Sequence, residues 1–445
     1  MLRFVNKRTI QSQWGLLTRR WMSGKTRVMS FGDGAQSALG LAASSIGLGF
    51  DAYEPTPVPG LPPDVSSVAA GHYHSLAVTS QGHVWAWGRN NELQLGRRGS
   101  STTFSSEMWN KPQKIEGFTQ VRVQAAIASG VISAAIGDDG SLWVWGKSKR
   151  GQLGLGKDIT EAVLPARVEA LIGQEIVKVS LGWGHALALT KDGKLFGWGY
   201  YADGRLGKIG KYLEASPLDS VASKVKTMNE YSKSVFEAAE KLVSEAIEKE
   251  KDMPVIWEPT LIRELYDVEV VDVACGLDHS LVLCSDGSLL SGGSNVYGQL
   301  GRVKVDLGLH LVDISLQPIS IASGLGHSFA ICKSKSPEDE EDGLCVVTWG
   351  WNQSCQLGRE GPENIPLVVD GLEGEMPVSV SGGRVHSIAV TGKREVWAWG
   401  CGRNGRLGLG SSADEAEPML VENLEGCEVL QAVAGFDHNL VLVAE

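Results

Sequence analysis

Six histidines recur at one point of a repeated phrase, and imidazole is a side chain that binds transition metals and moves protons. Each follows a glycine by three residues, in the pairs Gly71/His74, Gly182/His185, Gly276/His279, Gly324/His327, Gly383/His386 and Gly435/His438. Each pair lies in a different copy of the phrase, and no H-x-x-H or H-E-x-x-H spacing gathers zinc ligands. We therefore expect no metal site, and we interpret the histidines as buried groups that bond the backbone between adjacent strands.

Motifs for enzymatic chemistry are missing from the sequence. There is no P-loop, no G-x-S-x-G and no paired-carboxylate motif. The glycine-rich stretch 402–410 has the spacing of turns rather than of a phosphate cradle. We expect no catalytic residues and no cofactor, which favours a non-enzymatic binding protein.

A second signature closes a later strand of each copy with an aromatic residue and glycine. Its members are Trp87-Gly88, Trp145-Gly146, Trp198-Gly199, Trp349-Gly350, Trp399-Gly400 and Phe31-Gly32. The remaining copy has Gly292-Gly293, and a Leu-Gly turn such as Leu95-Gly96 follows each pair. We interpret these tryptophans and glycines as packing and turn residues.

The phrase returns seven times with a period near 50 residues, which suits a propeller blade of four short strands. One copy departs from the pattern, because Gly130 is followed three residues later by Ser133 instead of histidine. Runs such as "HSLAVT" and "VWAWG" are typical of strands, and Asp-Gly pairs mark the turns between them.

The seventh copy is divided between the two ends of the chain. Residues Val433–Val443 supply its front half and Val28–Gly40 its back half. A closed ring of blades needs such a division, because strands from both ends then complete one sheet. The prediction is an all-β, seven-bladed β-propeller over 28–445, closed by N- and C-terminal strands that share one blade, with a helical insertion.

The ordered signatures G-x-x-H-S/T, W-G and Q-L-G resemble the regulator-of-chromosome-condensation repeat family, over Val28 to Val443. The resemblance implies a seven-bladed propeller. The family's founder exchanges nucleotide on a small GTPase through a wedge-shaped β-hairpin, and no comparable β insertion is readable here. A light-sensing plant member uses a G-W-R-H motif, which only Gly182-Trp183-Gly184-His185 approaches, so we do not expect a photoreceptor.

The first 27 residues carry seven basic side chains, no acid and scattered large apolar residues such as Phe4 and Trp14. This composition predicts a mitochondrial transit peptide, 1–27, and hence the mitochondrial matrix. Arg20-Trp21-Met22-Ser23 resembles a matrix-protease cleavage site. The alternative is a basic tail that binds nucleic acid.

Charge and composition favour protein partners. The chain has 41 basic and 52 acidic residues, so removing the seven basic residues of the leader leaves 34 against 52, a net charge of −18. Such a body repels phosphate backbones, and direct RNA binding is expected to be weak. No apolar run approaches a membrane span. Seven cysteines without C-x-x-C spacing indicate a reducing compartment, and the sequence does not specify the oligomeric state.

The largest interval between copies contains a predicted helical insertion, 216–251. Apolar residues recur there at helical spacing, among them Leu218, Val221, Val225, Met228, Val235 and Leu242. This face either packs on the side of the propeller or docks a partner, and a disordered loop is the third alternative. A second insertion, 335–343, reads as an acidic loop.

Together these features predict a protein-binding platform in the mitochondrial matrix. Organellar members of the family imply a role in mitochondrial RNA processing, namely intron splicing of complex I subunit transcripts and thereby complex I biogenesis. The expected partners are RNA-processing factors or a GTPase. The alternatives are a guanine-nucleotide exchange factor for a mitochondrial GTPase and a scaffold for respiratory-complex assembly.

Overall fold

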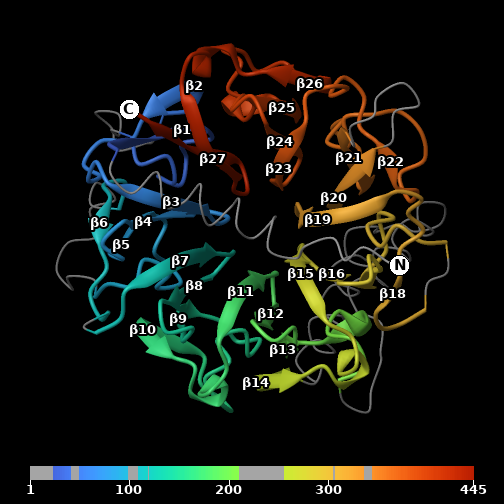
Figure 1. The fold of residues 1–445 in the computed structure, drawn as a ribbon. Coiled ribbons are helices and arrows are strands. Elements are labelled where there is room, and N and C mark those ends of the chain that lie inside the picture. Colours follow the sequence, from blue (N-terminus) through green and yellow to red (C-terminus); the bar gives the residue numbers. More distant parts are fainter. Residues whose placement is uncertain are drawn as a thin grey trace, which may run out of the picture.

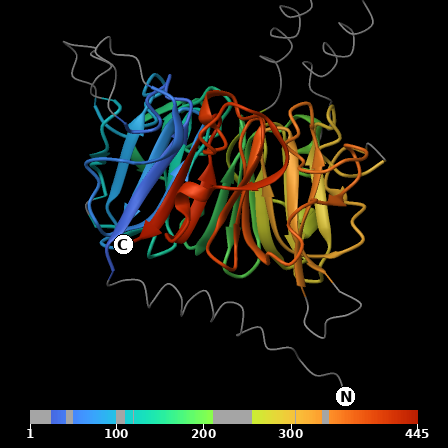
Figure 2. The same cartoon turned by 90° about the horizontal axis from the view of Figure 1, so that it is seen from above.

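The computed structural model describes residues 24–41, 50–98, 109–118, 120–209, 255–303, 306–334 and 343–445. These residues form seven four-stranded antiparallel sheets arranged as blades around a central axis (Figure 1). Seen from the side, the sheets run between the two faces of the ring (Figure 2). The predicted seven-bladed all-β propeller is confirmed. The predicted helical insertion and residues 1–23 of the leader lie outside the described residues.

Each blade has an inner strand beside the axis, and we number the blades in chain order. The inner strands of blades 1 to 7 are β3 (Val65–Ala70), β7 (Val123–Ala128), β11 (Ile176–Leu181), β15 (Val270–Cys275), β19 (Gln317–Ser323), β23 (Pro377–Gly382) and β27 (Glu428–Ala434). The second strands are β4 (His74–Thr79), β8 (Ile132–Gly137), β12 (His185–Thr190), β16 (His279–Cys284), β20 (His327–Ser334), β24 (His386–Thr391) and β28 (His438–Ala444).

The two outer positions complete each sheet. The third strands are β5 (Val84–Gly88), β9 (Leu142–Lys147), β13 (Leu195–Tyr200), β17 (Leu289–Gly293), β21 (Gly343–Gly350), β25 (Val396–Gly400) and β1 (Thr26–Gly32). The outermost strands are β6 (Gln113–Lys114), β10 (Glu161–Arg167), β14 (Val255–Leu261), β18 (His310–Leu311), β22 (Leu367–Val368), β26 (Glu415–Leu420) and β2 (Ala52–Pro57).

Short 3-10 turns are the helices of the described residues. They are η2 (Glu169–Leu171), η3 (Ala202–Gly204), η4 (Arg263–Leu265), η5 (Arg403–Gly405) and η6 (Glu422–Leu424). Within the described ranges, no helix has the length and apolar character to cross a bilayer.

The two ends of the chain meet in blade 7, whose strand order is β2-β1-β28-β27. Strand β1 pairs with β28 over seven residues, from Thr26 opposite Ala444 to Gly32 opposite His438. The Glu445 amide donates to the Lys25 carbonyl at 2.9 Å. The predicted closure through a shared blade is therefore confirmed.

The second strands are buried on both faces because each blade is covered by a neighbour on either side. Every residue of β4, β8, β12, β16 and β24 is buried. Strands buried on two faces need near-continuous apolar runs, as these sequences show. The core lies between blades: Trp87 and Ala77 of blade 1 pack in one cluster with Leu440 of blade 7.

The Gly-x-x-His signature is a single steric unit. A Cβ on Gly276 would lie 2.0 Å from Cε1 of His279, because the imidazole folds back against the glycine. Blade 2 has no histidine, and there Ser129 and Ile132 occupy the two positions: the Ser129 amide bonds the Ile132 carbonyl at 3.0 Å, as Gly71 bonds His74 in blade 1. The sequence alignment on Gly130 and Ser133 is therefore wrong by one residue.

This steric unit predicts a coupled pair of substitutions. Gly276→Ser should destabilise the fold by about 3 kcal/mol, because the new Cβ overlaps the His279 ring. Adding His279→Ile should recover much of that loss, since blade 2 already combines serine with isoleucine at these positions. Urea unfolding of the two single variants and the double variant measures the coupling. Additive losses would contradict the interpretation.

Candidate functional site

The six repeat histidines link neighbouring blades. Their Nε2 atoms lie 2.8 to 3.1 Å from side chains of the next blade, in the pairs His74–Ser133, His185–Ser280, His279–Ser328, His327–Ser387, His386–Asn439 and His438–Ser75. The Ser133 hydroxyl donates to the Gln94 carbonyl at 2.9 Å, so it accepts from the imidazole. Sequence analysis expected backbone partners, whereas the partners are side chains.

The belt of histidine bonds has one open junction, between blades 2 and 3. The histidine position there is Ile132 and its partner position is Ala186, and both side chains are fully buried. The imidazole donor and its acceptor are both replaced by apolar side chains. Neither position therefore holds a buried polar group without a partner. We call this junction the apolar seam.

Burial keeps these imidazoles neutral. It lowers the pKa of His74, His327 and His438 to about 3 and that of His279 and His386 to about 4. Each imidazole lies at a separate junction. Among the residues that the structure describes, no three His, Cys, Asp or Glu side chains come together as a metal would require. The geometry thus gives the histidines a structural place between blades.

The tryptophans of the Trp-Gly pairs form a second link between blades. All five are fully buried, and each indole Nε1 donates to a carbonyl of the preceding blade, in the pairs Trp87–Ala38, Trp145–Gln94, Trp198–Gln152, Trp349–Gln299 and Trp399–Gln356. The glycine that follows each tryptophan has a positive φ, for example +106° at Gly88, where a Cβ would lie 2.6 Å from the Tyr73 carbonyl oxygen.

Ion pairs of a buried arginine replace the tryptophan bond at the two remaining junctions. In blade 4 Gly292 stands at the tryptophan position, and Arg205 of blade 3 pairs with Asp278 of blade 4 at 2.5 Å. In blade 7 Phe31 stands at the tryptophan position, and Arg406 of blade 6 pairs with Asp437 of blade 7 at 2.8 Å. Sequence analysis missed these pairs. The signal for them was a G-R-L-G turn followed by G-x-D-H in the next blade, found in both places.

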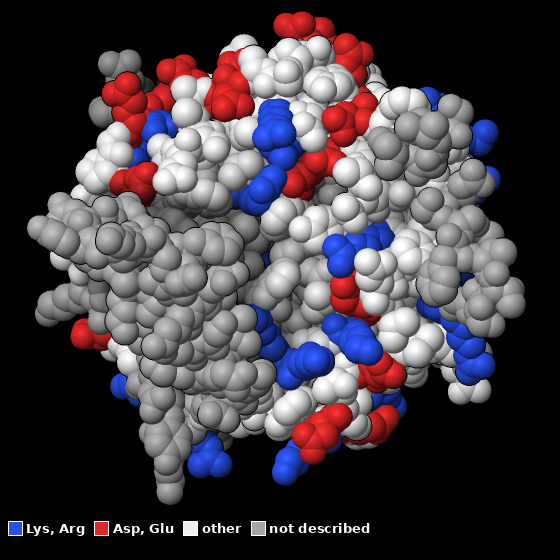
Figure 3. Space-filling model, turned by 180° about the vertical axis from the view of Figure 1, so that it is seen from behind, with Lys and Arg blue, Asp and Glu red and all other residues white. Residues whose placement is uncertain are grey.

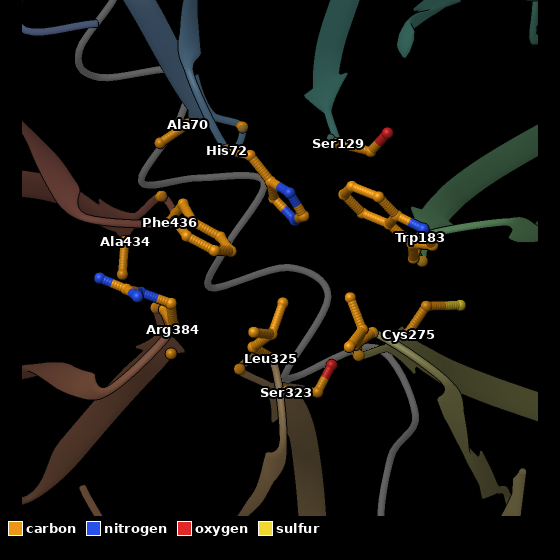
Figure 4. A pocket seen from close by; sticks show the side chains of 18 of the residues that line it. Ala70, His72, Ser129, Trp183, Cys275, Ser323, Leu325, Arg384, Ala434 and Phe436 are labelled. Carbon is orange, nitrogen blue, oxygen red and sulfur yellow. The ribbon is translucent and has the colours of Figure 1, made fainter. Parts of the chain in front are cut away.

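The Gly-x-x-His turns surround one mouth of the central channel, and we call this side of the ring the turn face. In the six blades with a histidine, the residue after the opening glycine lines the mouth, and a cavity of about 130 Å³ lies there. In Figure 4, His72, Trp183, Leu325 and Phe436 point toward the centre. Backbone bonds join neighbouring turns, such as the Phe436 amide to the Gly71 carbonyl at 3.1 Å. The ring therefore holds these side chains in place.

Arginines and aromatic rings stack around this mouth. Arg89 lies 5.2 Å from the centre of the Tyr73 ring and Arg384 lies 4.9 Å from that of Phe436. Stacking also joins His72 to Trp183, with ring centres 5.3 Å apart. Lys and Arg side chains gather around the central hollow of this face (Figure 3).

The mouth has the chemistry of a binding site rather than of a catalytic one. Burial lowers the pKa of His72 to about 4, which makes it a weak base, and raises that of the Cys275 thiol to about 12, which keeps it from acting as a nucleophile. Arginine, tyrosine and tryptophan are the residues most enriched where proteins bind one another. The predicted docking helix, with Leu218 to Leu242, lies outside the described residues.

These observations define a class, a seven-bladed propeller that presents a binding mouth on one face. The sequence profile of the RCC1-like domain matches residues 27–441, and the chain belongs to this family.

Curated relatives agree with that assignment, and a solved structure shares the fold. The chain is 29% identical over 369 residues to the ultraviolet-B receptor UVR8 of Arabidopsis thaliana, covering 81% of this chain and 70% of the receptor. It is 30% identical to the RCC2 homolog of Danio rerio, covering 86% and 71%. It spans only 7% of the human ubiquitin ligase HERC2. The structure of Prp20p from Saccharomyces cerevisiae superposes with a TM-score of 0.72 at 20% identity, over 96% of this chain and 94% of that one.

The buried histidines predict a loss of stability in acid. The unfolded chain binds a proton on each imidazole below pH 6.5, whereas folded His327 does so only near pH 3. The free energy of unfolding should therefore fall as pH drops from 6.5 toward 4, because the unfolded state takes up more protons.

A variant that copies the apolar seam isolates this effect. Gly324→Ser, His327→Ile and Ser387→Ala together should fold and should reduce the pH slope by one proton, about 1.4 kcal/mol per pH unit. Urea titrations at several pH values compare the two slopes. An unchanged slope would mean that His327 does not enter the folded state neutral.

Proposed function

We propose that this chain is a non-enzymatic platform that binds protein partners through its turn face. The observation that carries the proposal is the mouth of stacked arginine and aromatic side chains, held in position by backbone bonds between blades. Rigid aromatic groups give a large contact area at little cost in conformational entropy. Membership in the RCC1-like family supports a binding role.

We further propose that the protein acts in the mitochondrial matrix and assists RNA processing there through other proteins. The basic, acid-free leader supports import, and the net charge of −18 on the remaining chain supports protein contacts over RNA contacts. The yeast homologue Prp20p has been solved in a study of its binding to Gsp1p and histones. Protein partners on a propeller of this fold are consistent with that precedent.

A second candidate function is nucleotide exchange on a GTPase, and one feature favours it. Strands β20 and β21 of blade 5 are eight residues long, whereas the same hairpin in blade 4 has strands of six and five residues. Sequence analysis found no β insertion, so the longer hairpin of blade 5 is a feature that the sequence pattern did not predict. Its tip, 335–342, lies outside the described residues. Acceleration of nucleotide release from a matrix GTPase would favour exchange, and no acceleration would leave the platform function.

Two aromatic substitutions test the platform. Proximity labelling with the protein in intact mitochondria should recover RNA-processing proteins. Tyr73→Ala with Trp183→Ala should reduce that recovery at least fivefold, because Trp183 lines the mouth and Tyr73 packs against Phe436 at its edge. Tyr53→Ala is the control, since Tyr53 is an exposed tyrosine on the outermost strand of blade 7. Equal recovery with the unchanged protein, the double variant and the Tyr53→Ala control would overturn the role of the mouth.

The proposed absence of direct RNA contact is tested separately. The purified chain from Gly24 onward should bind bare RNA weakly at physiological salt. Tight binding that falls steeply with salt concentration would contradict a protein-mediated role, because that dependence reports phosphate contacts.

A further inference from the structure

The face opposite the turn face has a feature that the platform function does not use. Each inner strand contains a β-bulge at its start, where the pairing register shifts by one residue, for example between Ile176 and Lys178 in β11. The bulged residue is apolar in blades 3 to 7 and polar in blades 1 and 2. These residues are Val177, Val271, Ile319, Val378, Leu430, Ser66 and Gln124.

Leu430 of blade 7 is half-buried and packs against the core, whereas the other four apolar bulged residues are exposed. Their exposed fractions are 49% for Val177, 45% for Val271, 39% for Ile319 and 38% for Val378. A bulge re-aims a side chain out of the regular alternation, so these residues leave the packed interface between blades. We call Val177, Val271, Ile319 and Val378 the apolar arc.

Bonds between blades hold the arc together. One residue beyond the bulges, Lys178 of β11 pairs with Asp272 of β15. The same Asp272 accepts from the Ile321 amide of β19 at 3.2 Å. Strands β11, β15, β19 and β23 follow one another around the centre (Figure 1). The bulged residues of these four blades therefore lie on neighbouring strands beside the channel.

The connections that lead into these strands enlarge the apolar surface. Ile172, Tyr266 and Met376 come within six residues before β11, β15 and β23 and have exposed fractions of 58%, 64% and 41%. Blades 1 and 2 have no apolar bulged residue, so the surface is confined to one side of the ring. Clustered exposed apolar residues with a polar rim are typical of a protein contact.

Carboxylates line the edge of the arc. Glu175 and Glu269 directly precede β11 and β15, Glu375 precedes β23 and Glu428 begins β27. Glu175 and Glu375 pair with lysines at the surface, at 2.7 and 2.8 Å. Exposed pairs of this kind contribute little energy, and a cationic partner can exchange with those lysines.

We propose that the apolar arc is a docking surface for a basic, amphipathic segment of a partner protein. The apolar residues supply contact area and the carboxylates at the edge select lysine and arginine. Nucleic acid does not fit, because its phosphates would face those carboxylates. A second copy of this chain does not fit either, because its own acidic rim would meet the same charges.

The position of the arc gives the ring two separate contacts. The Gly-x-x-His turns follow the C-terminal ends of the inner strands, and the bulges lie near their N-terminal ends. The two surfaces are therefore on opposite faces of the ring (Figure 2). The arc is independent of the mouth, and failure of one function leaves the other intact.

Peptide binding to the full chain tests the arc. The probe is a fluorescent 18-residue helical peptide of leucine and lysine with one apolar face, measured by anisotropy. Val271→Ser with Ile319→Ser should weaken its binding at least fivefold, and raising the salt concentration should weaken it further. Both changes replace exposed residues, and thermal unfolding checks that the fold is kept.

A control variant and a control peptide complete the experiment. Val303→Ser removes a valine that is 74% exposed and lies outside the arc, and it should leave binding unchanged. A leucine and glutamate peptide of the same pattern should bind at least tenfold more weakly. Equal binding to all variants, or equal binding of the two peptides, would overturn the proposal. So would a dimer in sedimentation that the arc variant dissociates, because the surface would then serve a second copy.

Discussion

The ring depends on the joint between one blade and the next. At six junctions a buried, neutral imidazole bonds a serine or asparagine of the next blade. At five of them that side chain also donates to a carbonyl of the blade that carries the imidazole, as Ser133 does to Gln94. A buried polar group without a partner costs more than a satisfied one contributes, so the imidazole Nε2 and the side chain that it bonds depend on each other across the junction. Residues that look like independent repeats are therefore paired across junctions, and the pairing determines the spacing of the blades and the width of the channel.

The sequence predicted the blade count, the shared blade and the burial of the histidines, because these follow from a regular pattern. The sequence-based prediction failed where other residue types replace the repeated ones. Ser129 was overlooked as a repeat position. Blade 2 has no histidine ring against this position, so the residue there need not be glycine. The pair Arg205–Asp278 was also missed, because its members lie in different copies and each looks like a variable position. The mouth and the arc depend on which side chains the turns and bulges direct outward, and periodicity carries no such information.

Both candidate surfaces arise from the same inner strands. At one end the Gly-x-x-His turn must leave room for an imidazole, and the residues between glycine and histidine extend into the mouth, as His72 and Trp183 do. At the other end a bulge turns one side chain away from the neighbouring blade, as at Val271. The positions that pack the ring are thus separate from the positions that contact a partner. Substitutions can change the binding surfaces while the joints stay the same.

The apolar seam has a further consequence for how the ring comes apart. Ile132 and Ala186 contact one another's blades only through nondirectional packing, whereas the same positions at the other junctions hold an imidazole bond. Separating blades 2 and 3 breaks two bonds of Gln152, whose carbonyl accepts from Trp198 and whose amide donates to the Gly182 carbonyl, but no imidazole bond. The resistance of this junction to opening therefore depends on one glutamine, away from the sheet that joins the chain ends. Without the Gln152 side chain, amide hydrogens of β8 and β12 would exchange with solvent before those of β28, even though β28 belongs to the blade that the two chain ends build.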